Sequence, residues 1–211
     1  MASSVIHMAV SNEINKKLNR NNEKLLIGSI APDISKYLGE SKLITHFLDS
    51  EDSNIPNIEK FLKKYKTKLY DDFVLGYFIH LYTDYLWFKY FIPEIYEDKN
   101  KCITKLDGTF IKCVGKMSSK YIYNDYTNLN SKLLDEYDMD LSIFYNELPL
   151  FENIIKEIPM DKIKIIVDES SIIIKNSKIN KELVFNIDNV KKFIETTTKL
   201  ILAKLNEIDI S

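Results

Sequence analysis

The stretch Asp71-Asp-Phe-Val-Leu-Gly-Tyr-Phe-Ile-His-Leu-Tyr-Thr-Asp-Tyr-Leu-Trp-Phe-Lys-Tyr-Phe91 decides the fold of this chain. Two acidic residues, Asp71 and Asp72, come first, where the positive end of a helix dipole favours them, and the residues that follow are apolar on nearly every side. Other helices must surround such a helix, so we predict a central buried helix over about 71–91. Gly76 costs this helix roughly 1 kcal/mol relative to alanine, which indicates that another backbone approaches it closely.

The composition agrees with an all-α fold. The chain has 211 residues, of which 45% are hydrophobic, enough for one sizeable core. Its five glycines and five prolines are too few for the many tight turns of a β-sandwich. We therefore predict a single-domain helical bundle over residues 1–211, built around the central helix.

The remaining segments are predicted from their periodicity and their turn residues. Helical spacing predicts further helices at 5–18, 57–68, 121–137, 140–158 and 187–208. Three segments have a less regular pattern: a loop or broken helix at 25–34, a long excursion or lid at 98–120, and a helix or short strand at 160–175.

Charge and targeting signals narrow the class of partner. Lysine and arginine number 29 against 31 acidic residues, a net charge of −2, so no global basic field attracts nucleic acid or an anionic membrane. The first residues contain no basic and apolar signal-peptide pattern, and no window has the ~20 apolar residues of a membrane span. We therefore expect a cytoplasmic protein.

All three histidines, His7, His46 and His80, lie in the first 80 residues. His80 and Asp84 are four residues apart on the central helix, so their side chains project from one face. A buried aspartate needs a hydrogen-bonding partner or a cation, and Asp33 and His46 could supply further metal ligands. Two simpler interpretations are a hydrogen-bonded pair at 80 and 84, and three unrelated histidines whose side chains do not meet.

Four segments in this order resemble the zinc-dependent phospholipase C family, which is related to a group of zinc-dependent nucleases. They are His7, the stretch Leu26-Ile-Gly-Ser-Ile-Ala-Pro-Asp33, Thr45-His-Phe47, and Leu75-Gly-Tyr-Phe-Ile-His-Leu-Tyr-Thr-Asp-Tyr-Leu-Trp87. The resemblance covers about residues 1–90. It implies an all-α protein with a buried cluster of up to three zinc ions that hydrolyses a small-molecule or lipid phosphoester.

The resemblance also implies roles for individual residues. Asp33, His46, His80 and Asp84 would surround one zinc ion, and Asp84 would bridge to a second zinc ion held by His7. In the family the terminal amine completes the second site, which here would be the amine of Ala2 after removal of Met1. A zinc-bound hydroxide would attack phosphorus, and Asp33 would orient or deprotonate the water.

One departure from the family pattern limits the expected cluster. The family has a histidine six residues after the bridging aspartate, and this chain has Tyr90 there and no later histidine. We therefore predict one or two ions, of zinc or another divalent transition metal. Carboxylates that could substitute as ligands are Glu94, Glu97, Asp98 and Asp125, the last flanked by Tyr121, Tyr123 and Tyr126. The departure also motivates an alternative, a non-catalytic metal-binding helical protein with a structural or partner-binding role.

Overall fold

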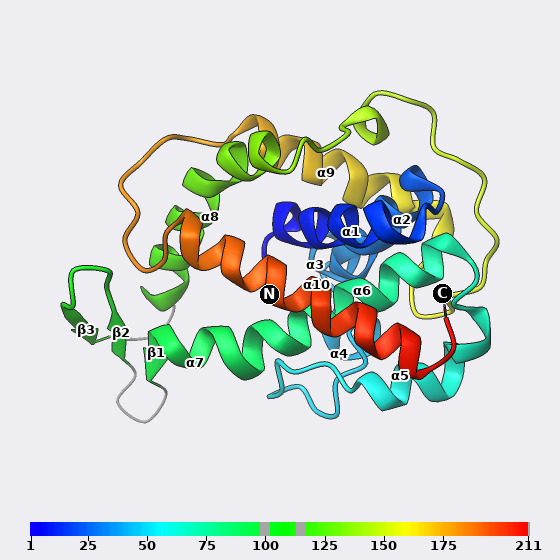
Figure 1. Cartoon of the computed structure of the whole chain (residues 1–211), viewed down its shortest axis with the longest axis horizontal. Helices are drawn as coiled ribbons and strands as arrows, with labels where there is room; N and C mark the ends of the chain where they lie inside the picture. Colours follow the sequence, from blue (N-terminus) through cyan, green and yellow to red (C-terminus); the bar gives the residue numbers. More distant parts are fainter. Residues whose placement is uncertain (98–101, 113–116, 211) are drawn as a thin grey trace.

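A computed structural model describes residues 1–97, 102–112 and 117–210 of the chain (Figure 1). The helices are α1 (Ser4–Leu18), α2 (Asn22–Ile30), α3 (Ile34–Leu38), α4 (Lys42–Thr45), α5 (Ile58–Tyr65), α6 (Asp72–Leu86), α7 (Ile92–Ile95), α8 (Met117–Glu136), α9 (Ile163–Lys175) and α10 (Ile187–Glu207). Short helical turns are η1 (Ala31–Asp33), η2 (Lys66–Lys68), η3 (Trp87–Phe91), η4 (Ser142–Phe144) and η5 (Met160–Lys162). The strands β1 (Tyr96–Glu97), β2 (Cys102–Thr104) and β3 (Phe110–Lys112) form a small antiparallel sheet at one end of the molecule.

Helix α6 is the centre of the fold, and the predicted all-α class is confirmed. The Asp71 side chain caps the helix, since its Oδ1 accepts hydrogen bonds from the backbone N–H groups of Phe73 and Val74, each at 3.0 Å. Helices α1, α2, α5 and α10 pack around it. The helical path continues past α6 as the π-helical turn η3 and then as α7, so the predicted range of 71–91 starts at the N-cap but ends four residues before the helical path does.

Two glycines let α2 and α6 cross in direct backbone contact. A Cβ atom placed on Gly76 would lie 2.1 Å from the carbonyl oxygen of Leu25, and one placed on Gly28 would lie 2.2 Å from that of Phe73. No side chain fits such gaps. The close approach predicted at Gly76 is thus confirmed. It places the C-terminal end of α2, and with it η1 and Asp33, against the turn of α6 that carries His80.

The predicted helix over 140–158 is wrong. Only Ser142–Phe144 is helical there, and the rest is an extended connection. Pro149 lacks a backbone N–H and disfavours helix at the residue before it. Three separate isoleucines of the connection are buried, namely Ile143, Ile155 and Ile158. Their spacing in the sequence resembles that of the apolar face of a helix. The backbone N–H of Lys156 donates to the Tyr65 hydroxyl at 3.0 Å instead of to a helical carbonyl.

Two further segments differ in detail from the prediction. Within the range 98–120, β2 and β3 pair as antiparallel strands, and α8 begins at Met117, four residues before the expected start. Residues 98–101 and 113–116 lie outside the described residues. The prediction that these residues belong to a lid is therefore not tested. The range 160–175, for which helix and strand were both open, contains the helix α9.

The buried apolar side chains form one cluster, to which helices from both halves of the chain contribute. Val5 and Ile14 of α1 belong to it, as do Leu129 of α8 and Ile201 of α10. A single domain over residues 1–211 stays a prediction. Within the described ranges, no helix combines the length and the apolar character that crossing a membrane requires.

Candidate metal centre

Four short segments bring the five predicted metal-binding side chains together. His7 lies in the first two turns of α1, Asp33 ends η1, His46 follows the last residue of α4, and His80 and Asp84 are on α6. All are buried: Asp33 is 6% exposed and the others at most 1%. The interpretation that the three histidines are unrelated is therefore wrong.

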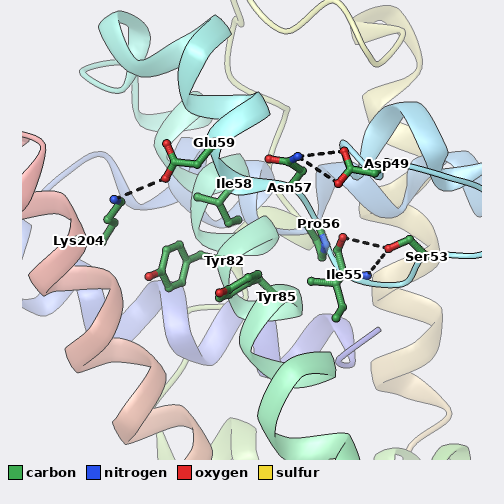
Figure 2. A pocket seen from close by; sticks show the side chains of 10 residues that line it. All are labelled: Asp49, Ser53, Ile55, Pro56, Asn57, Ile58, Glu59, Tyr82, Tyr85 and Lys204. Atoms are coloured by element: carbon green, nitrogen blue, oxygen red, sulfur yellow. Dashed lines mark hydrogen bonds and ion pairs between the residues drawn. The ribbon is translucent and has the colours of Figure 1, made fainter. Parts of the chain in front are cut away.

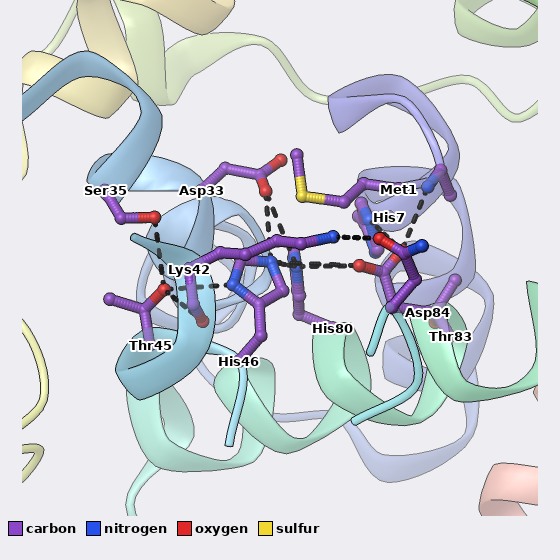
Figure 3. A network of polar contacts seen from close by, with 12 residues as sticks. Met1, His7, Asp33, Ser35, Lys42, Thr45, His46, His80, Thr83 and Asp84 are labelled. Carbon is purple, nitrogen blue, oxygen red and sulfur yellow. Dashed lines mark hydrogen bonds and ion pairs between the residues drawn. The ribbon is translucent and has the colours of Figure 1, made fainter. Parts of the chain in front are cut away.

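One ring nitrogen or carboxylate oxygen from each of four residues points to a common space (Figure 3). The Nε2 atom of His46 lies 3.3 Å from Nε2 of His80, 3.3 Å from Asp33 Oδ1 and 3.8 Å from Asp84 Oδ2. His80 Nε2 lies 3.9 Å from Asp33 Oδ1 and 3.8 Å from Asp84 Oδ2. Ligand atoms of a tetrahedral zinc site, at ~2.0–2.1 Å from the ion, stand about 3.3 Å apart. Five of the six distances among the four atoms, 3.3–3.9 Å, are thus close to what one such ion requires, while Asp33 and Asp84 fall into different groups of potential ligands.

The second oxygen of Asp84 faces a different partner. Its Oδ1 lies 3.4 Å from Nε2 of His7, and it accepts a hydrogen bond of 2.9 Å from the backbone N–H of Ala2. The His7 ring also stacks on the His80 ring, with ring centres 3.7 Å apart and planes at 12°. His7, His80 and Asp84 form one group with potential ligand atoms in mutual reach, and Asp33, His46 and His80 form another. Asp84 therefore stands where a bridging carboxylate would stand.

Hydrogen bonds on the far side of two imidazoles orient their lone pairs. His80 Nδ1 lies 2.7 Å from the carbonyl oxygen of Ser29, and because a carbonyl only accepts, Nδ1 carries the proton. His46 Nδ1 lies 2.9 Å from the Thr45 hydroxyl, which donates to Ser35 and is free to accept the Nδ1 proton. Both Nε2 atoms then present lone pairs to the common space, the arrangement that metal-binding histidines show.

The electrostatics of the cluster favour the protonation states that bind metals. Burial, together with repulsion from His7, lowers the pKa of His80 to about 3, so its imidazole is neutral at neutral pH. Burial acts to raise the pKa of Asp33 and of Asp84, but close imidazoles outweigh it, chiefly His46 for Asp33 and His7 for Asp84, and hold both pKa values below the usual range. Two ionised carboxylates therefore share a dry space with the neutral imidazole of His80.

This donor set fits a divalent transition metal. Among the described residues, Asp33 Oδ1, Asp84 Oδ2 and both ring nitrogens of His7 are buried without a hydrogen-bond partner. Unpaired buried polar atoms are costly, and unpaired buried charges more so. One cation would satisfy Asp33 Oδ1 and Asp84 Oδ2, and a second would satisfy one nitrogen of His7.

A cavity of about 260 Å³ adjoins the cluster at Asp33, which lines it. Its wall also includes Tyr37, Tyr123 and Tyr126, together with the buried Asn130. Of the three tyrosines that flank Asp125 in the sequence, Tyr123 and Tyr126 line this cavity and Tyr121 does not. The cavity gives the ligand cluster a neighbouring space for an organic group.

A second hollow, of about 370 Å³, lies between the 49–57 loop, α6 and α10 (Figure 2). Polar side chains that line this hollow interact with one another. Glu59 forms an ion pair with Lys204 at 3.7 Å, and the Asn57 amide donates a hydrogen bond to Asp49 at 2.9 Å. No histidine lines it. We do not consider it a candidate site.

The two candidate substitute ligands whose side chains the structure describes, Asp125 and Glu94, do not join the cluster. Asp125 is buried, but its oxygens accept backbone N–H groups of Leu183, Val184 and Phe185 at 2.8, 2.6 and 3.1 Å, so the prediction of a spare metal ligand is corrected to a structural carboxylate. Glu94 is exposed and, like Tyr90, lines a separate hollow beside the sheet. The side chain of Glu97 and all of Asp98 lie outside the described part.

Sequence reasoning missed the residues that orient the ligands. The Ser29 carbonyl contacts His80 across 51 positions of the chain, and no residue-type signal reveals a backbone contact. Thr45 precedes His46 directly, and a hydroxyl beside a histidine was a usable signal. Lys42, four residues before His46, was also missed.

A comparison with known protein families finds one match. The family model described as zinc dependent phospholipase C matches residues 4–206. The match extends through the C-terminal half, where no motif could be identified beyond about residue 90. Neither a curated protein nor a solved structure matches the chain.

Proposed function

The chain belongs to the zinc-dependent phospholipase C family, and from this premise we propose that it hydrolyses a phosphoester with one or two divalent metal ions. At the level of the family, the match and the two ligand groups support a phospholipase C-like zinc phosphoesterase. In our proposal, Asp33, His46, His80 and Asp84 hold the first ion. His7 and Asp84 hold the second, with the amine of Ala2 as a further ligand if Met1 is removed.

The observation that carries this proposal is the pair of facing imidazole nitrogens. Nε2 of His46 and Nε2 of His80 lie 3.3 Å apart, and each ring has its other nitrogen at hydrogen-bonding distance from an oxygen acceptor. Two lone pairs at this distance repel each other unless a cation lies between them. The ionised Asp33 and Asp84 beside them complete a nitrogen and oxygen set suited to zinc.

When bound, zinc supplies Lewis-acid chemistry: it polarises a phosphoryl oxygen and lowers the pKa of a bound water. The protein supplies position and a hydrogen-bond acceptor for the water. Asp33 is the one ligand side chain of the cluster that also lines the cavity, and its pKa is held below the usual range, so its carboxylate stays ionised and can accept a hydrogen bond that orients a water molecule. Tyr37, Tyr123 and Tyr126 would contact the organic part of the substrate.

A structural or partner-binding role for the metal is the second candidate function. It is favoured by Tyr90, which stands where the family has a histidine, is 54% exposed and lines a hollow beside the sheet that contains none of the five ligands. Neither of the two ligand groups among the described residues extends beyond Asp84, so no third metal position is evident there.

Metal content and turnover separate the two functions. The purified protein is analysed for bound metals by mass spectrometry and anomalous scattering, then assayed on phosphodiesters and phospholipids with zinc, manganese or nickel. Turnover that His46→Ala abolishes supports the hydrolase. Metal-dependent stability without turnover of any substrate supports the structural role.

The matched control for this experiment is Asp168→Asn. Asp168 is an exposed aspartate that pairs with Lys164 on α9 and should change neither metal content nor turnover. A wild-type protein with less than ~0.5 equivalents of any transition metal, and a His80→Ala variant that melts like it, would contradict both candidate functions.

A further inference from the structure

The side chain of Lys42 lies near the metal centre. Lys42 begins α4 and is half-buried, and in the view of Figure 3 its side chain crosses in front of His46 and His80, while both Asp84 and Asp33 attract its amine electrostatically. Two groups hold the amine in place: Nζ donates to Asn54 Oδ1 at 2.5 Å and lies 5.5 Å from the centre of the Phe88 ring.

The amine of Lys42 is partly desolvated and lies in the field of two carboxylates. Burial lowers the pKa of Lys42, and attraction to Asp84 and Asp33 offsets this lowering only in part. An ammonium group has three N–H donors, and among the described residues only Asn54 accepts one of them. Two donors therefore remain for an anion that enters beside the ligand cluster.

The net charge of the metal centre indicates a role for the Lys42 ammonium. Asp33 and Asp84 contribute two negative charges, and the imidazoles are neutral when they bind a metal. One divalent ion therefore brings the four-ligand group to zero net charge, which offers no electrostatic attraction to a phosphodiester anion. The ammonium of Lys42 makes the centre positive on the side where its donors are free.

We propose that Lys42 binds the phosphate of the substrate, as a charged hydrogen-bond donor beside the metal. The proposal rests on the proposed function, since it assigns a residue to the same site. Lysine is a common phosphate ligand because its ammonium is a compact charge that can reach any phosphate oxygen. The competing explanation is that Lys42 only neutralises Asp33 and Asp84.

The test measures phosphate binding apart from turnover. Wild type, Lys42→Met, Lys42→Arg and the control Lys63→Met are loaded with zinc and freed of excess metal, and their zinc content is determined. Lys63 is an exposed lysine of α5. Inorganic phosphate is then titrated into each by calorimetry, and KM and kcat are measured on the best phosphodiester substrate.

Lys42→Met should weaken phosphate binding about ten- to a hundredfold, as the loss of a charge-assisted hydrogen bond implies, and should raise KM. Its zinc content should equal that of the wild type. Lys42→Arg should recover most of the phosphate affinity, and Lys63→Met should match the wild type.

Several results would overturn the proposal. Unchanged phosphate affinity in zinc-loaded Lys42→Met means that Lys42 does not bind phosphate. A Lys42→Met protein that fails to fold or to load zinc shows that Lys42 is a structural counter-ion. A wild-type protein that loads no metal overturns the Lys42 proposal together with the hydrolase. A zinc-loaded wild type that binds phosphate through Lys42 but turns over no substrate contradicts the hydrolase alone.

Discussion

At His46, one hydroxyl decides which ring nitrogen faces the other ligands. The Thr45 side chain is buried, and its Oγ1 lies 2.9 Å from His46 Nδ1 and 3.2 Å from the Ser35 hydroxyl. Thr45→Val keeps the shape of the side chain but removes this partner. We expect zinc affinity to fall about 10–100-fold, because second-shell partners of metal-binding histidines have effects of this size. Competition with a coloured chelator measures the change.

The control for this substitution is Thr196→Val, at an exposed threonine of α10. It removes the same hydroxyl far along the chain from the ligands and should leave zinc affinity as it is. If Thr45→Val binds zinc as tightly as Thr196→Val, the His46 ring is oriented by packing alone.

The residues of the site could be named from the sequence, but their orientation could not. His80 and Asp84 could be paired because a spacing of four places side chains on one helix face. The Ser29 contact depends on where α2 crosses α6, and the reach of Lys42 over the cluster depends on the loop that holds Asn54. Such contacts follow from packing between distant segments, which no local pattern encodes.

At the level of elements, the crossing of α2 and α6 aligns the ligands. Gly76 lies one turn before His80, and Gly28 directly precedes Ser29, whose carbonyl fixes the His80 ring. Gly76→Ala would place a methyl group 2.1 Å from the Leu25 oxygen, so the helices must separate. We expect a loss of at least about 3 kcal/mol in the free energy of unfolding, measured by chemical denaturation, and a loss of bound zinc.

Gly39→Ala is the control for Gly76→Ala, because it introduces backbone strain without steric crowding. Gly39 has a φ of 70° and open space around its Cβ position. Alanine there should cost about 1–2 kcal/mol for the left-handed conformation and should keep the zinc. Equal losses in the two variants would mean that the helix crossing carries no special constraint.

The elements that could be predicted are those whose pattern has a local cause. The apolar stretch and the acidic cap at Asp71 are both part of α6 itself. In the same way, the stripe of buried apolar residues that predicts α10 is part of α10 itself. The connection at 140–158 could not be recognised, because its isoleucines are buried against other segments at helical intervals without forming a helix. The small sheet is built from strands of two and three residues, too short to show a period.

For the whole molecule, the C-terminal half completes the core rather than the ligand cluster. Trp87, which follows α6, contacts Phe185 and Phe193 at ring-centre distances of 5.8 and 4.9 Å. The Asp125 carboxylate of α8 holds the backbone of residues 183–185 beside these rings. The family match over residues 4–206 is therefore expected to reflect packing in this half, whereas the candidate metal ligands all lie in the first.

The metal should contribute to the stability of the whole fold, because its ligands come from α1, η1, α6 and the end of α4. With free zinc at a hundred times the dissociation constant, binding stabilises a folded protein by about 2.7 kcal/mol. For a chain of 211 residues this corresponds to roughly 5–11 °C in Tm. We expect a chelator to lower the wild-type Tm by about this amount in calorimetry, and to leave the Tm of His80→Ala unchanged. Asp125→Asn is the control, since it should lower the Tm with and without zinc while keeping the difference between them. A wild-type Tm that does not respond to the chelator would show that the buried carboxylates are stable without a cation, and that the five side chains form a polar core and no metal centre.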